Sequence, residues 1–167
     1  MIARKPAQAA RIGSLTTALG KDKLVLTRFE GTEGLSELFE YRVEALSSDP
    51  NLNFNPAIGE KCCITLKTHS GTDRHFHGIL VATQWAGKQV DLYAYRLVIR
   101  PWFWLLTRSS NCRIFKDKNV PDIIKEVFAG HGGYATCQPK LRTSYPELKY
   151  CVQYRESDFD FVSRLME

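Results

Sequence analysis

Apolar and polar residues alternate in several segments, which is the pattern of strands with one buried face. The alternation is clearest from Phe39 to Ala45, where Tyr41 and Val43 share the apolar face with the two end residues. Further strands are predicted at residues 11–17, 24–27, 62–68, 74–85, 90–99, 113–115 and 150–153. Gly78 interrupts one of them, which predicts a bulge or a close backbone approach that helps a sheet to curl. Successive antiparallel hairpins of this length predict a β-barrel or a strongly coiled sheet.

Two helices are predicted from capping residues and apolar spacing. The first runs from Val120 to Ala129, with Asn119 as its N-cap and Gly130 just beyond its end. Its expected buried stripe is Ile123, Ile124, Val127 and Phe128. The second begins at Ser157, where Asp160 completes a capping box. The fold class is therefore α+β and mainly β, with two or three helices attached to the sheet.

Five consecutive apolar residues, Trp102 to Leu106, follow Pro101. Aromatic residues beside arginines can stack on nucleic-acid bases, but such residues are usually presented singly on a sheet face. A cluster after a proline is more typical of a buried turn. We therefore expect four core anchors in this part of the chain: Trp102, Trp104, Ile124 and Phe128.

The chain of 167 residues is long enough for one domain with a substantial core. We expect a flexible tail over residues 1–10 and one β-barrel domain over residues 11–167, cut inside its last helix. No apolar run approaches the ~20 residues of a membrane span, and the basic N-terminus lacks the apolar segment of a Sec signal. The five cysteines, an odd number without such a signal, predict reduced thiols and folding in the cytoplasm.

The net charge of +5 is unevenly distributed. Residues 28–49 hold six acids against two bases, a balance of −4. Residues 100–118 hold five bases against one acid, a balance of +4. Two opposite stretches favour docking between subunits as much as two solvated faces. The residues expected to take part in interactions are Arg100, Arg108, Arg113, Lys116 and Lys118.

Residue patterns that could carry chemistry are incomplete. His75 and His77 share one face of a strand, but only His69 and the pair Cys62–Cys63 could complete a metal site. Capping of a helix accounts for the carboxylates at residues 156, 158 and 160. The glycines at 130–133 follow a helix instead of preceding one, so they cannot form a phosphate loop. No serine lies in a nucleophile elbow. We therefore expect no metal, no cofactor and no enzymatic activity.

Three blocks of sequence resemble the N-terminal part of VgrG proteins, the spikes of type VI secretion, and of their Rhs-linked relatives. They are EGTEGLSELFEYRVEALSSD (30–49), RLVIRPWFWLLTRSSNCRIFKDKNVPDII (96–124) and YCVQYRESDFDFVSRLME (150–167), with FHGI at 76–79 between the first two. The resemblance implies a fold like that of phage tail baseplate hubs and late control protein D. It also implies a trimer in the full-length protein, with the Hcp tube, baseplate components and effector or adaptor proteins as partners. Export would take place through the type VI apparatus after assembly in the bacterial cytoplasm.

Two other interpretations remain beside this one. A basic β-barrel could bind nucleic acid, in which case binding to generic DNA would depend on salt; the resemblance gives no reason to expect such a partner. The chain could also belong to a phage tail baseplate hub, although its match to VgrG is the closer one. Because a trimer of the VgrG family is held largely by its downstream needle, we expect this chain alone to be mainly monomeric in dilute solution.

Overall fold

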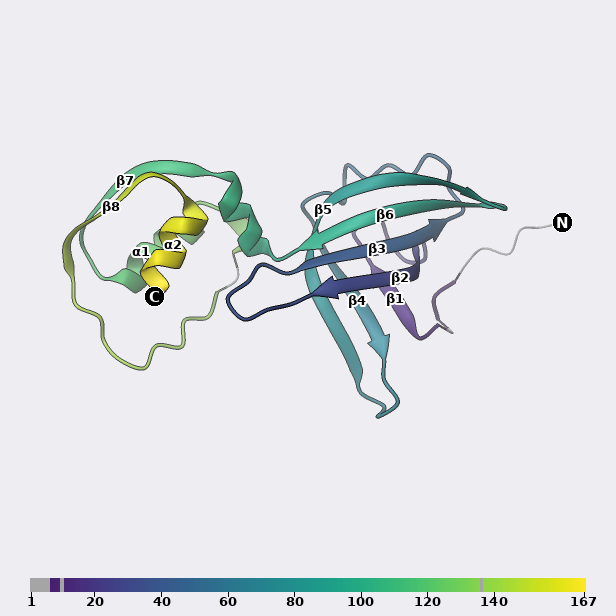
Figure 1. Cartoon of the computed structure of the whole chain (residues 1–167), viewed down its shortest axis with the longest axis horizontal. Helices are drawn as coiled ribbons and strands as arrows, with labels where there is room; N and C mark the ends of the chain where they lie inside the picture. Colours follow the sequence, from purple (N-terminus) through teal and green to yellow (C-terminus); the bar gives the residue numbers. More distant parts are fainter. Residues whose placement is uncertain (1–6, 10, 136) are drawn as a thin grey trace. The chain divides into compact units, whose positions relative to one another are not determined.

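The computed structural model describes residues 7–9, 11–135 and 137–167. The chain divides into two compact units, Met1–Pro101 and Trp102–Glu167 (Figure 1). The sequence predicts one domain over residues 11–167, whereas the structure has two units, each with its own sheet and its own buried core. The division falls at Pro101, where the last strand of the first sheet ends and the aromatic segment begins.

The first unit is a single curled sheet of antiparallel strands. Its strands are β1 (Gly13–Thr16), β2 (Val25–Thr32), β3 (Glu40–Ser47), β4 (Lys61–Lys67), β5 (Asp73–Gln89) and β6 (Leu92–Arg100). Their order across the sheet is β1-β4-β5-β6-β3-β2. Strands β1 and β2, at the two ends of this order, also come close to each other, so the sheet curls back on itself (Figure 1). The predicted mainly β fold with a coiled antiparallel sheet is confirmed.

The curl depends on β5, whose two halves have different partners. Its first half pairs with β4 as far as Ile79, and its second half pairs with β6 from Ile79 onward. Gly78 lies at this change of partner. A Cβ atom there would stand 2.5 Å from Cγ2 of Ile99 and 2.8 Å from the carbonyl oxygen of Arg100. Only glycine fits so close an approach, and the close backbone contact predicted at this residue is confirmed.

The core of the first unit is built by the alternation seen in the sequence. Tyr41, Val43 and Ala45 of β3 are buried, while the residues between them face outward or are half-buried. All six strands contribute buried apolar residues to one cluster. Within it, the ring of Phe29 lies 4.8 Å from that of Phe76 and 5.4 Å from that of Tyr41, measured between ring centroids. These edge-on and tilted aromatic contacts add to the apolar area that stabilises the sheet.

Gln8 lies between the two end strands of this sheet. Its side chain is buried, and its Oε1 accepts hydrogen bonds from the backbone N–H groups of Leu15 in β1 at 2.6 Å and Leu26 in β2 at 3.4 Å. Its Nε2 donates to the carbonyl oxygen of Leu15 at 3.0 Å. Gln8 thus satisfies backbone groups of both strands, while the flexible tail over residues 1–10 stays a prediction. Residues 1–6 and 10 of that prediction lie outside the described residues.

The second unit is a curved two-stranded ribbon with helices on one side. Its elements are the 3-10 helix η1 (Trp102–Arg108), β7 (Ser110–Lys118), α1 (Val120–Ala129), the 3-10 turn η2 (Gly132–Tyr134), β8 (Leu148–Ser157) and α2 (Asp158–Met166). Strands β7 and β8 pair antiparallel, and α1 and α2 lie within the concave side of the ribbon (Figure 1). Among the described residues, no helix has the length and apolarity needed to cross a bilayer.

Both predicted helix starts are confirmed. Asn119 caps α1, because its Oδ1 accepts a hydrogen bond from the backbone N–H of Asp122 at 2.9 Å. Ser157 caps α2, because its Oγ accepts from the backbone N–H of Asp160 at 3.0 Å. Gly130 follows the end of α1 as predicted, but in a right-handed conformation. The positive φ that ends many helices occurs two residues later, at Gly132.

The core of the second unit gives the predicted anchors unequal positions. The buried cluster contains Leu106, Phe115, Ile123, Val127, Phe128, Phe161 and Val162. Phe128 belongs to it, whereas Trp102 and Ile124 are only partly buried against it, and Trp104 is half-buried. The fully buried line of α1 is Ile123 with Val127, one turn apart, so Ile124 stands at the margin of the stripe.

Candidate interaction surfaces and a buried carboxylate

The five basic residues expected to take part in interactions are divided between the two units and have different partners. Arg100 ends β6 in the first unit and pairs with Glu40, while the other four belong to the second unit. Lys118 pairs with Glu126. Arg113 turns inward, as described below, which leaves two exposed cations. These are Lys116 on β7 and Arg108, whose guanidinium carbon lies 5.7 Å from the centroid of the Trp104 ring.

Most acids of the acidic stretch form ion pairs with arginines of the same sheet. The pairs are Arg28–Glu30, Arg42–Glu40, Arg96–Glu44 and Arg74–Glu33, and they lie largely on the surface. Hydrogen bonds from Arg42, followed by those from Arg100, hold the pKa of Glu40 below its ordinary value although burial opposes them. Exposed pairs of this kind contribute about 0–1 kcal/mol each. These pairs neutralise most of the predicted acidic surface. The acidic residues that remain available to a partner lie in the β2–β3 loop, where Glu37 is exposed.

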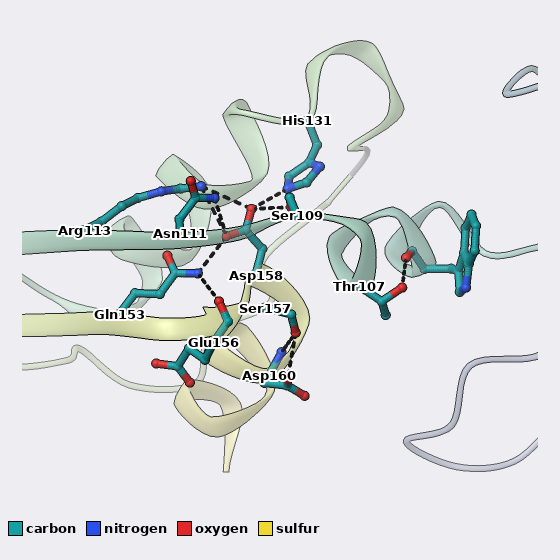
Figure 2. A network of polar contacts seen from close by, with 11 residues as sticks. Thr107, Ser109, Asn111, Arg113, His131, Gln153, Glu156, Ser157, Asp158 and Asp160 are labelled. Atoms are coloured by element: carbon teal, nitrogen blue, oxygen red, sulfur yellow. Dashed lines mark hydrogen bonds and ion pairs between the residues drawn. The ribbon is translucent and has the colours of Figure 1, made fainter.

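A buried carboxylate lies at the centre of the second unit. Asp158, the first residue of α2, is 1% exposed, and Figure 2 shows the side chains that converge on it. Five side chains contact its two oxygens: Ser109 at 2.8 Å, Asn111 at 3.0 Å, Arg113 at 3.1 Å, His131 at 2.9 Å and Gln153 at 2.7 Å. Its backbone N–H donates to the carbonyl oxygen of Ser109. One side chain thus joins β7, the segment after α1, β8 and α2.

The environment of Asp158 keeps it ionised. Burial by itself raises the pKa of this carboxyl, but hydrogen bonds from Gln153, Asn111, His131 and Ser109 outweigh it and lower the pKa to about 2. The nearby Arg113 guanidinium supplies a compensating charge. A buried carboxylate with this many donors is a structural centre, because its loss leaves several buried polar groups without an acceptor.

Capping explains only one of the three carboxylates at the start of α2. Asp160 takes part in the cap with Ser157, as predicted. Glu156 instead forms an ion pair with Arg164 at 2.7 Å. The prediction that capping also accounts for Asp158 is wrong, because its side chain points into the unit. The sequence held a signal for this buried carboxylate. The alternate positions 109, 111 and 113 carry a serine, an asparagine and an arginine, which places three polar side chains on one face where they can contact a charge.

The arrangement of Ser109, Asp158 and His131 differs from that of a catalytic triad. In a triad the imidazole lies between the hydroxyl and the carboxylate, so that it can take the proton of the nucleophile. Here the carboxylate lies between the other two, and both contact the same oxygen, Oδ2 of Asp158. His131 is therefore not placed to activate Ser109. Instead, Asp158 holds together the three chain segments that contain Ser109, His131 and Asp158 itself.

The histidine pair on β5 gains a neighbour from β4. Cys63 is opposite His77 in the sheet register, with Sγ 4.0 Å from Nε2. His75 is opposite Thr65, and its Nδ1 lies 3.0 Å from Oγ1 of that threonine. Within the described part of the chain, no three histidine, cysteine, aspartate or glutamate residues are grouped so as to hold a metal ion. His69 and Cys62, the other candidates, do not change this, and Cys62 is buried with a pKa raised to about 12, mainly by burial.

The outer face of the ribbon is apolar, which the sequence analysis missed. Four large side chains on it are exposed: Ile114 by 66%, Tyr150 by 69%, Val152 by 39% and Tyr154 by 64%. A signal for it was present, because one alternate set of residues in 150–154 is apolar or aromatic throughout, whereas the other set contains Gln153. A two-stranded ribbon with a core on one side has no second layer for the residues of this apolar set. Their exposure follows from this arrangement.

A curled antiparallel sheet followed by a ribbon with two helices is the architecture of β-rich tail-hub proteins. It matches the E. coli c3393 protein, described as a type VI secretion component with structural similarity to the T4 tail proteins gp27 and gp5. The TM-score is 0.76 at 26% identity, over 92% of this chain and 42% of that one. The chain belongs to the phage tail baseplate hub (GPD) family, which it matches over residues 32–167.

Among curated proteins, the chain is similar to type VI secretion spike proteins of Pseudomonas aeruginosa. It is 45% identical to VgrG1b over 161 residues and 43% identical to VgrG1c over 160 residues. Each alignment covers 96% of this chain and 22% of the relative, so the chain spans about a fifth of the length of these relatives. The resemblance to VgrG proteins noted in the sequence is confirmed.

Proposed function

We propose that the chain is the N-terminal part of a type VI secretion spike and acts by assembly. In this role three copies of the full-length protein form the spike, dock on the tube of Hcp and support the delivery of effector or adaptor proteins. The observation that carries the proposal is 45% identity to a spike protein along 96% of the chain. A match of this extent covers both units. The protein would assemble in the bacterial cytoplasm and leave through the apparatus.

The proposal includes no enzymatic activity for these two units. The support is that the polar groups that could take part in catalysis make structural contacts instead. Asp158 and His131 contact each other and tie the second unit together, and the imidazole is not between the carboxylate and Ser109. The exposed cations and the acidic ion pairs suit contacts between proteins better than contacts with a small substrate.

Binding of the full-length protein to purified Hcp rings tests this role. The wild type should retain the rings in a pull-down at low salt and lose them progressively as salt rises. Replacement of Arg108 and Lys116 by glutamate should weaken retention by about ten-fold or more, because both cations are exposed. The matched control replaces the exposed Lys21 and Lys88 of the first unit by glutamate, with the same change of charge.

The result also separates the spike from a phage tail hub. Retention of Hcp that falls only in the Arg108 and Lys116 variant supports docking through the second unit. An equal loss of Hcp retention in both variants would show that only the net charge of the protein matters. A full-length protein that never retains Hcp, together with Hcp release into the medium that is unchanged after deletion of its gene, would contradict the proposed role.

A further inference from the structure

The outer face of the β7–β8 ribbon has the character of an interface. Its exposed members lie opposite one another in register: Ile114 with Val152, Lys116 with Tyr150 and Cys112 with Tyr154. The helices lie on the other side of the ribbon (Figure 1). Directly opposed apolar side chains form a continuous strip, and contiguous exposed apolar strips mark surfaces that bind another protein.

The charges on this strip are positive. Lys116 is exposed within it, and the guanidinium carbon of Arg155 lies 5.2 Å from the centroid of the Tyr154 ring. The positions that share this face, 112, 114 and 116 on β7 and 150, 152 and 154 on β8, contain no aspartate or glutamate. The surface that fits it is therefore apolar at its centre and bordered by carboxylates.

The chain itself carries such a surface in the loop between β2 and β3. Leu35 is 97% exposed there, the largest exposed fraction among the exposed large apolar side chains described. It stands between Glu33 and Glu37, which are both exposed. Glu33 is held by Tyr41 and Arg74, so the loop is anchored to the sheet, while Ser36 has a φ of 60° that turns the chain beside Leu35. The loop thus presents one apolar side chain with a carboxylate on each side.

We propose that the β2–β3 loop of one copy docks on the β7–β8 face of a second copy. Leu35 would enter the strip near Ile114 and Val152, with Glu37 beside Lys116. The two surfaces differ, so the contact is head-to-tail; contacts of this kind close into a ring when the rotation between copies permits it, and the proposed ring holds three copies. The inference rests on the proposed spike of three copies and names the surfaces that meet in it. One loop on one face is a small contact, which agrees with the expectation that this chain alone is mainly monomeric in dilute solution.

Cys112 offers a direct test, because it is exposed on the same face. The variant Leu35→Cys is placed in a background in which Cys63 and Cys137 are serine. Under mild oxidation at high protein concentration it should form disulfide-linked dimers and larger species at a rate that rises with concentration. Adding Cys112→Ser should slow this linking about ten-fold or more, and high salt should slow it as well. Val90→Cys, at a comparably exposed residue (88%) in the turn between β5 and β6, should link only at the slow rate of random collisions.

Charge reversal provides the second measurement. Glu37→Lys or Lys116→Glu alone should slow the linking of Leu35→Cys to Cys112, and the two together should restore it. Equal rates for Leu35→Cys and Val90→Cys would overturn the proposal. A disulfide within single chains, formed at a rate independent of concentration, would also overturn it, because the loop would then meet its own chain. Hcp retention by the full-length protein is read separately with Arg108→Glu alone, because Arg108 lies outside the β7–β8 face, so the contact can fail while the spike role stands.

Discussion

The two units place their charges and apolar groups in opposite ways. In the first unit aromatic and aliphatic residues from all six strands fill the interior, and arginine–glutamate pairs lie on the outside. In the second unit a carboxylate with five partners lies inside, and a strip of tyrosine, isoleucine and valine lies outside. A six-stranded curled sheet encloses its own core, whereas a two-stranded ribbon covers only one of its faces. The smaller unit therefore depends on buried polar contacts and leaves an apolar face exposed.

Removal of the buried carboxylate should have the largest effect on stability. We expect Asp158→Ala to lower the free energy of unfolding by about 3–5 kcal/mol, because Arg113, His131 and their neighbours lose their acceptor. The matched change in the first unit, Glu44→Ala, breaks the surface pair with Arg96 and should cost less than about 1 kcal/mol. Urea unfolding is followed by far-UV circular dichroism, which reports on both units, and by fluorescence in a Trp85→Phe background, which reads the second unit through its two tryptophans. Similar losses for the two variants would remove the contrast between the units.

The side chains of α1 sharpen the contrast between core and margin. Ile123→Ala should cost about 2–5 kcal/mol, because this residue is fully buried. Ile124→Ala should cost about 1 kcal/mol, because Ile124 only packs against the edge of the cluster. Both values come from the same urea titration. A larger loss for Ile124 would show that the sequence-based choice of anchor was the better one.

Acid should affect the second unit through Asp158. Its pKa is about 2 in the folded chain and near its ordinary value of 3.8 in the unfolded chain, so the unfolded state takes up the proton first. The stabilisation is complete above about pH 4 and is lost as the pH falls towards 2. It amounts to about 2 kcal/mol. Unfolding followed at several pH values should show this decline, and Asp158→Asn should lack it.

Gln8→Ala should give a smaller loss, confined to the first unit. We expect about 1–2 kcal/mol, because the backbone groups of Leu15 and Leu26 lose a shared partner but gain access to water. Hydrogen exchange at these two amides should become faster. Gln84→Ala, at an exposed glutamine of β5, serves as the control and should leave both amides unchanged.

The sequence predicted local features well, but it predicted poorly which residues distant in the chain lie together. The limits of α1, the caps at Asn119 and Ser157 and the close approach at Gly78 were predicted, because each depends on residues near in sequence or on one missing side chain. The curled sheet followed from the alternation of residues. The family followed from long ordered blocks, so that this part of the interpretation depended on resemblance.

What the sequence did not show depends on contacts between distant residues. Asp158 meets Asn111 and His131 from 47 and 27 residues away, and Gln8 meets Leu26 from 18 residues away. The basic stretch looked continuous along the chain, yet Arg100 lies in one unit and Arg113 turns inward in the other. Charge counted along a sequence does not distinguish a cation on a surface from one that serves a buried carboxylate.

The close approach at Gly78 also limits which substitutions this sequence can accept during evolution. At Gly13, an added Cβ would meet the side-chain tips of Leu26 and Leu66, so a smaller residue at either position could compensate for a substitution. At Gly78 it would meet the carbonyl oxygen of Arg100 as well as Ile99, and backbone cannot be exchanged by mutation. Homologous chains that keep this curl should therefore vary at residue 13 together with its neighbours. They should retain glycine at residue 78 whatever residue stands at 99.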